Sequence, residues 1–199
     1  MTNPQALPWG LEWAIEPASW QFDGKTAAID AATSTDAFVD PAGASAVLDA
    51  ARALAVASSD RWQFSAKVTV DFHATYDAGA LLLWSDDRHF AKLCFEYSPQ
   101  GDAMVVSVVT RDVSDDANSW TVDGDTVWLR ISKIADQAYA FHSSGDGMRW
   151  SLVRYFALAG SRPVQYGIGV QSPTGDGCAV RFDELKLSET SLADLRDGS

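Results

Sequence analysis

The stretch GALLLW-SDDR-HFAKLCFEY-SPQGD-AMVVSVVT-RDVSD, residues 79–115, decides the fold of this chain. It contains three short runs rich in branched and aromatic residues, which are separated by the turn-forming clusters SDDR and SPQGD. Runs of this composition favour β-strands, and short polar breaks between them favour hairpins. The stretch therefore predicts three consecutive antiparallel strands. Its valines at 105, 106, 108 and 109 put apolar groups on both faces, so these strands should be covered on both sides.

The middle run carries two charged residues on one face. In an extended strand, Lys92, Cys94 and Glu96 point to the face opposite Leu93 and Phe95. Lys92 and Glu96 are four residues apart, which is roughly 13 Å by strand rise, so they cannot pair with each other. An unpaired charge on a covered face is costly, and each of the two therefore needs another partner.

The rest of the chain shows the pattern of short strands. Residues 62–73 alternate apolar and polar side chains, which is typical of a half-buried antiparallel strand. The Asp-Gly pair at 23–24 is a two-residue hairpin signal, and the pair at 146–147, within the loop 143–147, predicts another hairpin. Residues 45–58 are the exception, because their apolar spacing and their alanines favour a helix. About eleven to thirteen short strands indicate an all-β fold of two packed antiparallel sheets.

Length and composition limit the class of protein. A chain of 199 residues, 47% of them hydrophobic, can bury one large core, so we expect a single domain over residues 1–199, with its core at about 9–187 and a C-terminal tail at 188–199. The sequence has no basic, apolar leader and no apolar run near the roughly 18 residues of a membrane helix, which predicts a soluble, cytoplasmic protein without a membrane partner. The net charge of -12 repels polyanions, so nucleic acid is not an expected partner. We interpret the acidic segment 112–125 as a solvated polar connection.

The residues that bind metals or carry out nucleophilic chemistry lack the spacing of a known site. Cys94 and Cys178 lie in predicted strands, which indicates buried free thiols rather than a disulfide. His73, His89 and His142 lie on separate predicted strands without ligand spacing. The sequence contains no phosphate loop, dinucleotide fingerprint or G-x-S-x-G elbow. We therefore expect no metal and no cofactor.

An ordered set of short motifs runs along most of the chain. The motifs are Thr35-Asp36-x-Phe38, Ala78-Gly79-Ala80-Leu81-Leu82, Lys92-x-x-x-Glu96, Val105-Val106-Ser107-Val108-Val109-Thr110 with Ser114-Asp115, Trp128-Leu129-Arg130, Ser143-x-x-Asp146-Gly147-x-x-Trp150, Arg154, and Gly167-x-Gly169-x-Gln171-Ser172-Pro173. This set resembles the regulation-of-enolase family, a domain-of-unknown-function family with the concanavalin A-like lectin/glucanase fold. The resemblance implies a curved two-sheet jelly roll with a concave groove. It also implies an irregular segment and a strand near Leu54 within residues 45–58, rather than a long helix.

Two interpretations of the charged residues stay open. In the first, Arg130 and Arg154 pair with Glu96 in a buried network that holds the concave sheet together. In the second, polar side chains form the floor of a groove that binds a carbohydrate or another small polar ligand, with Ser114-Asp115 at the rim as a turn cap or a ligand contact. The candidate ligand-binding residues are Lys92, Glu96, Ser114, Asp115, Trp120, Arg130, Arg154 and Gln171. The tryptophans at 84, 120, 128 and 150 are candidates to stack a sugar ring, although tryptophan in a sandwich is more often core.

Three functions are compatible with these residues. The first is a non-enzymatic binding module, and the second is a regulatory protein that contacts a metabolic enzyme, as the family name suggests, which makes a protein the partner. The third is a glycoside hydrolase, for which retaining chemistry needs two carboxyl groups about 5 Å apart. Cys94 and Ser98 are the same-face neighbours of Glu96, so that strand supplies only one carboxylate. A second would have to come across space, from Asp115 or Asp183.

Overall fold

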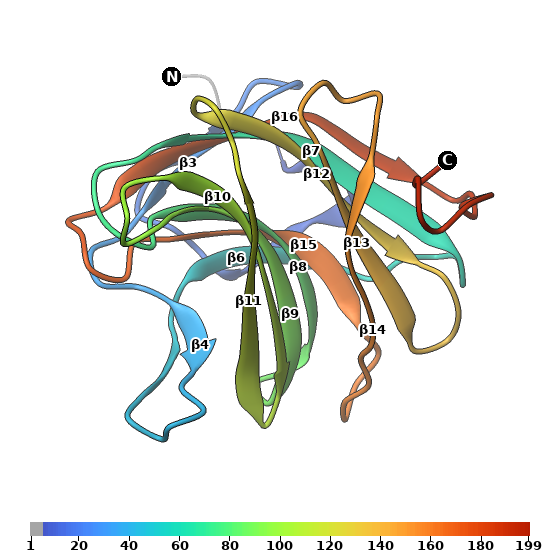
Figure 1. Cartoon of the computed structure of the whole chain (residues 1–199), viewed down its shortest axis with the longest axis horizontal. Helices are drawn as coiled ribbons and strands as arrows, with labels where there is room; N and C mark the ends of the chain where they lie inside the picture. Colours follow the sequence, from blue (N-terminus) through green and yellow to red (C-terminus); the bar gives the residue numbers. More distant parts are fainter. Residues whose placement is uncertain (1–5) are drawn as a thin grey trace.

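The protein is a sandwich of two antiparallel β-sheets. The computed structural model describes residues 6–199, which form sixteen strands and one short 3-10 helix, η1 (Pro8–Gly10). Sheet A has the strand order β1 (Glu12–Ile15), β6 (Ala51–Ala55), β15 (Gln165–Gln171), β8 (Ala78–Asp86), β9 (His89–Tyr97), β10 (Ala103–Arg111) and β11 (Val113–Thr121). Sheet B has the order β14 (Ser151–Ala157), β13 (Ala138–Ser144), β12 (Thr126–Lys133), β7 (Trp62–Asp71), β16 (Cys178–Ser188), β3 (Ala27–Ala31) and β2 (Trp20–Phe22). The predicted two-sheet fold is confirmed (Figure 1).

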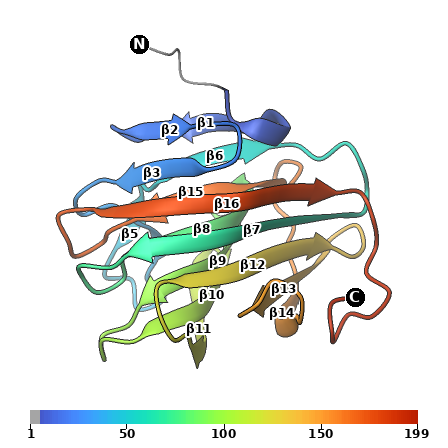
Figure 2. The same ribbon diagram turned by 90° about the horizontal axis from the view of Figure 1, so that it is seen from above.

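One apolar core fills the space between the two sheets; Figure 2 looks onto sheet B, with the strands of sheet A behind it. Strand β7 alternates buried and half-buried residues along its length, as the sequence predicts, with Phe64 and Val68 among those that point into the core. Strand β9 contributes Leu93 and Phe95 from the facing sheet. The alternation therefore leaves the even-numbered residues of β9, which include Lys92 and Glu96, on the outer face of sheet A.

The outer face of sheet A is also covered. A second apolar cluster lies there and includes Cys94, Val106 and Val108 from the central strands. The strands β4 (Ala37–Val39) and β5 (Ala46–Leu48) form a separate hairpin, which packs on this cluster and lies beside β11 (Figure 1). This cover confirms the expectation that β8, β9 and β10 are buried on both faces.

The prediction of a helix over residues 45–58, which local spacing favours, is wrong. This segment forms β5 and β6, and the strand near Leu54 that the family resemblance implies is present. Strand β6 pairs with β1 on one side and β15 on the other, and that pairing overrides helix propensity. Gly167 permits the close approach of β15, because a Cβ at this position would lie 2.0 Å from the carbonyl oxygen of Ala53.

The acidic segment 112–125 is not simply a connection. Most of it forms β11, which pairs with β10 and is the last strand of sheet A. Its side chains are mostly exposed, because only one edge of the strand is paired and little packs against its faces. Exposed acids on an edge strand keep it soluble and prevent pairing with other chains, which explains why its sequence resembles that of a loop.

Other local expectations are confirmed. The Asp-Gly pair at 23–24 joins β2 to β3, and the pair at 146–147 lies between β13 and β14. Cys94 and Cys178 are free and buried. Among the residues that the structure describes, no helix is long and apolar enough to cross a membrane.

Candidate functional site

A pocket of about 320 Å³ lies between the β4–β5 hairpin and the outer face of sheet A. Its lining residues are Asp36, Phe38, Asp40, Ser45, Tyr76, Lys92, Glu96, Val108, Asp116 and Gln171. The structure therefore brings together three of the residues selected from sequence, namely Lys92, Glu96 and Gln171.

Lys92 is a buried cation held by two acceptors. Its side chain is on the covered face of β9, and the residue is only 2% exposed. The Nζ atom donates to Gln171 Oε1 at 2.8 Å and to Asp36 Oδ1 at 3.2 Å. Burial by itself lowers the pKa of Lys92, but the nearby acidic groups, including Asp36 and Glu96, outweigh it and raise the pKa above its ordinary value. The ammonium group therefore stays charged in the pocket.

Glu96 lies on the same face as Lys92 and is 9% exposed. Burial raises the pKa of Glu96 to about 8; Lys92 opposes this shift, and Asp116 and Asp36 add to it. Within the described part of the chain its carboxyl group makes no hydrogen bond, so the group is free to bind a ligand. Because this pKa lies above 7, Glu96 is mostly a neutral carboxylic acid at neutral pH, with one O–H donor and remaining acceptor capacity.

Asp116 brings a second perturbed acid to the pocket from β11. Val108 of β10 pairs with Lys92 on one side and with Asp116 on the other, so the three residues lie in one row across the sheet. Burial raises the pKa of Asp116, and the cation of Lys92 partly offsets this. Glu96 is four residues further along β9, which by strand rise and strand spacing puts the Cα atoms of the two acids roughly 16 Å apart in a flat sheet.

The amide of Gln171 is fixed at both ends. Its Oε1 accepts from Lys92, and its Nε2 donates to the carbonyl oxygen of Tyr76 at 3.2 Å. These contacts connect β15 to β9 and to the turn that precedes β8. Two aromatic rings flank the polar groups, because Tyr76 and Phe38 line the same pocket, and the Phe38 ring centroid is 5.9 Å from Lys92 Nζ. The polar groups are thus held in place beside apolar surface.

Ser114 and Asp115 have separate roles, because neighbouring residues of a strand point to opposite faces. Ser114 is buried, and its Oγ accepts a hydrogen bond from the Val39 N–H at 3.0 Å, which ties the β4–β5 hairpin to β11. Asp115 pairs with Arg154 of β14 at 2.8 Å. That ion pair joins the last strands of sheets A and B, and neither residue lines the pocket.

The predicted pairing of Glu96 with Arg130 or Arg154 is wrong. Arg130 lies on the outer face of sheet B, because its neighbours Leu129 and Ile131 point into the core that separates the sheets. Arg154 is engaged by Asp115. The buried Arg–Glu network considered from the sequence therefore does not exist, and Lys92 acts on Glu96 only through space, without an ion pair.

The tryptophans selected from sequence do not surround this pocket. Trp84 is buried, stacks on Phe90 and lies under the guanidinium group of Arg52. Trp120 is on β11 and is 39% exposed, but it does not line the pocket. The tryptophans at 128 and 150 line a different pocket, on sheet B.

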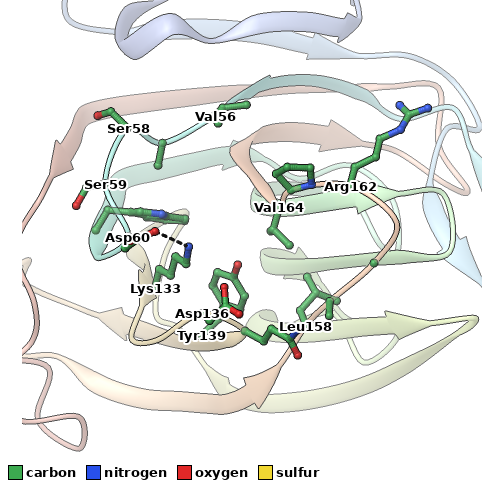
Figure 3. Close-up of a pocket in the computed structure, with 16 residues that line it drawn as sticks. Val56, Ser58, Ser59, Asp60, Lys133, Asp136, Tyr139, Leu158, Arg162 and Val164 are labelled. Atoms are coloured by element: carbon green, nitrogen blue, oxygen red, sulfur yellow. Dashed lines mark ion pairs between the residues drawn. The ribbon is translucent and has the colours of Figure 1, made fainter.

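A further pocket, of about 390 Å³, opens at one end of the sandwich (Figure 3). Asp60 and Lys133 form an ion pair of 3.9 Å on one side of it, and the buried ring of Tyr139 lies among its lining residues. Burial raises the pKa of Tyr139 to about 12, with Asp136 adding to the shift, so the phenol stays neutral. Its ion pair is already formed, which makes this a weaker candidate site than the pocket at Lys92.

Several pocket residues were missed at the sequence level. Asp36 and Phe38 belong to one of the family motifs, but no pattern indicates that they approach Lys92, which is 56 residues from Asp36 in the sequence. Asp116 was grouped with solvated acids, although the alternation of β11 with Ser114 places both on one face. Tyr76 follows no strand pattern and has a positive φ of 70°.

One family model covers most of the chain. The model of a family described as "Protein of unknown function (DUF1349)" matches residues 13–190. The chain belongs to the DUF1349 family. No curated protein matches it.

Solved structures share the fold of this DUF1349 chain. A functionally unknown protein from Saccharomyces cerevisiae has a TM-score of 0.81 and 22% identity, with 89% of this chain and 95% of that chain covered. A mutant of the GH43 protein BlXynB from Bacillus licheniformis has a TM-score of 0.75 and 13% identity, covering 92% of this chain but 37% of that chain. A xylan β-1,4-xylosidase from Bacillus halodurans has a TM-score of 0.74 and 11% identity, covering 94% and 38%. The DUF1349 chain thus spans less than two fifths of these two longer proteins.

The pocket of this DUF1349 chain can recognise neutral polar groups. It offers a fixed ammonium group, a fixed amide and a neutral carboxylic acid, and these supply both donors and acceptors. Within residues 6–199, no group of three or more His, Cys, Asp or Glu side chains is arranged to hold a metal ion.

Proposed function

We propose that this DUF1349 domain is a non-enzymatic binding module whose pocket at Lys92 and Glu96 takes a small polyhydroxylated ligand, with a carbohydrate as the chemical class. The observation that carries the proposal is the carboxyl group of Glu96, which lies in the pocket lining on a residue only 9% exposed and makes no hydrogen bond within residues 6–199. Its oxygens are not sealed in the protein, so a ligand hydroxyl can reach them and take the place of water.

The arrangement around Glu96 supports a rigid, neutral ligand. Lys92 and Gln171 are already held by their own contacts, so little side-chain entropy would be lost on binding. The volume of about 320 Å³ is near the lower end of the range for small-molecule pockets, which suits one or two sugar rings. Phe38 and Tyr76 supply the apolar surface against which a ring face can pack.

The similarity of fold suggests which sugars to test first. One structural neighbour is a xylan β-1,4-xylosidase, and this chain resembles about two fifths of it. Xylose and xylobiose are therefore sensible first probes, together with glucose and galactose. A role in enzyme regulation and a cytoplasmic location stay predictions from the sequence.

Isothermal titration calorimetry of the full chain against these four sugars tests the proposal. We expect one of them to bind. We expect Glu96→Ala to weaken that binding by about fivefold or more, because a neutral hydrogen bond contributes about 1 kcal/mol to the free energy of binding. Glu12→Ala is the matched control, because Glu12 is an exposed acid at the edge of sheet A.

Two results would count against the binding module. If Glu96→Ala and wild type bind the sugar with equal affinity, the binding site is not at Glu96. Turnover of a chromogenic xyloside that is lost in Glu96→Gln would replace the module with a glycoside hydrolase, the alternative that the raised pKa of Glu96 supports because such an acid can donate a proton.

A further inference from the structure

A separate pocket of about 420 Å³ lies on the outer face of sheet B. Its lining residues are Gln63, Ser65, Ala66, Trp128, Arg130, Gly147, Trp150, Glu184, Lys186, Ser188 and Thr190. They come from β7, β12, β16, the loop between β13 and β14, and the segment that follows β16. The apolar core of the sandwich separates this pocket from the one at Lys92 and Glu96.

The indole of Trp128 is fixed from two sides. Gly147 packs directly on it, since a Cβ at this glycine would lie 2.9 Å from Trp128 Nε1. Trp128 Nε1 also donates to Glu184 Oε2 at 3.2 Å. Glu184 has a positive φ of 52° and lies in a bulge of β16, where the pairing with β7 shifts between Asp183 and Lys186. Bulges redirect side chains and are frequent beside functional sites.

Arg130 is a buried cation without an anion. It is 9% exposed, and it forms no ion pair with any residue in the described range 6–199. Its guanidinium carbon lies 4.1 Å from the ring centroid of Trp150. Burial lowers the pKa of Arg130 to about 10, which still leaves it charged at neutral pH. A buried charge without a counter-charge is costly, so this arginine has an unmet need for a carboxylate or similar anion.

Of the two N–H groups on one edge of the Arg130 guanidinium, only one has a hydrogen-bond acceptor. Nη2 donates to the carbonyl oxygen of Gly198 in the C-terminal tail, whereas Nε is buried without any partner. Nε and Nη2 form the edge of arginine that binds both oxygens of a carboxylate. His142 Nδ1, on the neighbouring strand and in register with Arg130, is likewise buried and without a partner.

The charge of the pocket favours an anion. Its lining carries Arg130 and Lys186 against the single carboxylate of Glu184, and Lys67 Nζ lies 5.0 Å from the ring centroid of Trp128. This local excess of positive charge occurs in a chain whose net charge is -12. The two indoles add flat apolar surfaces of the kind on which a sugar ring packs.

We propose that the sheet B pocket binds a hexuronate-type sugar acid, whose carboxylate takes the Nε and Nη2 edge of Arg130 while its ring packs on Trp128 and Trp150. In this structure the carbonyl group of Gly198 occupies one of the two oxygen positions. The ligand displaces this carbonyl, so binding at Arg130 is coupled to movement of residues 192–199. The site takes an acid, whereas the pocket at Glu96 is proposed to take a neutral sugar.

Nuclear magnetic resonance of the full chain labelled with ¹⁵N tests this site. The probe is methyl β-D-glucuronide, with methyl β-D-glucoside as the neutral match and acetate as the acid without a ring. We expect the glucuronide to shift the Arg130 Nε–H resonance, which is assigned by its loss in Arg130→Lys, and to shift the Gly198 amide resonance. Arg130→Lys keeps the charge but removes the two-donor edge, so it should weaken glucuronide binding by at least about tenfold.

A second variant separates ring packing from charge. Trp150→Leu keeps an apolar side chain but removes the indole face, and it should also weaken glucuronide binding severalfold; far-ultraviolet circular dichroism shows whether each variant is folded. Unshifted Nε–H and Gly198 resonances with the glucuronide would overturn the proposal. If the glucoside shifts these resonances as much as the glucuronide does, the carboxylate is not recognised. If acetate binds as tightly as the glucuronide, the sugar ring is not recognised. Either result would also overturn the proposal.

Discussion

Replacing Glu96 by glutamine should remove a pH dependence of stability that wild type shows at mildly alkaline pH. Burial raises the pKa of Glu96 from its ordinary value of 4.5 to about 8, so the folded chain binds a proton that the unfolded chain has released across most of this interval. A state that holds more protons loses stability as pH rises. The stabilisation is therefore complete below pH 4.5 and is lost as pH rises towards 8.

The size of the effect follows from the slope. One proton difference changes the free energy of unfolding by about 1.4 kcal/mol per pH unit. From pH 6.5 to 8 the free energy of unfolding therefore falls by about 1.5 kcal/mol. The fall is less than the full slope gives, because Glu96 in the folded chain is half ionised at pH 8. Glutamine cannot ionise, so Glu96→Gln should show no such loss.

Other titrating groups define this window. Burial lowers the pKa of His142 below its ordinary value of 6.5, so this imidazole binds a proton more readily in the unfolded chain. Its effect on stability fades as pH rises above 6.5 and is the same in wild type and in both variants. Burial raises the pKa of Asp116, which acts in the same direction as Glu96 but from a lower starting pH. The cysteines begin to ionise in the unfolded chain near their ordinary pKa of 9.0, above the window.

Urea unfolding at four pH values between 6.5 and 8, followed by tryptophan fluorescence, measures the slope. Wild type and Glu12→Gln, a matched change at an exposed acid, should lose about the same free energy, and Glu96→Gln should lose none. Equal slopes in wild type and Glu96→Gln would refute the assignment of Glu96 as a buried, protonated acid.

Three further predictions concern the frame of the sandwich. Gly167→Ala should destabilise the chain by about 3 kcal/mol or more in urea unfolding, because its Cβ would lie 2.0 Å from the Ala53 carbonyl oxygen; a loss below 1 kcal/mol would contradict this packing. Ser114→Ala should remove the acceptor of the Val39 N–H, and faster hydrogen exchange at Val39 would show the loosened hairpin, whereas unchanged exchange would contradict it. Cys94 should resist thiol reagents in the native state, because burial raises its pKa far above 9.0; labelling at the rate of an exposed thiol would contradict its burial.

The fold was predictable because its strongest signals are periodic. The alternation along β7 and the two-faced apolar runs of β8 to β10 decided the architecture, and the structure contains both. The two errors have physical causes. Alanine-rich β6 has helical spacing but is held by pairing on both sides, and acidic β11 has the composition of a loop because it is an edge strand.

The site was only partly predictable, because it depends on contacts between distant segments. Strand periodicity was enough to place Lys92 and Glu96 together on a covered face. It could not show on which of the two sheets Arg130 lies. Alternation separates the inward and outward faces of a strand, but it does not show to which sheet the strand belongs. The approach of Asp36 to Lys92 depends on the β4–β5 hairpin folding over sheet A, which has no local sequence signal.

The most direct test of the central claim is to titrate the full ¹⁵N-labelled chain with the sugar that binds most tightly and to map the resonances that move. The account predicts that the side-chain amide of Gln171 and the backbone amides of Lys92 and Glu96 move most, because these residues form the floor of the pocket. Shifts confined to other parts of the chain, with the Gln171 amide unchanged at saturation, would contradict it.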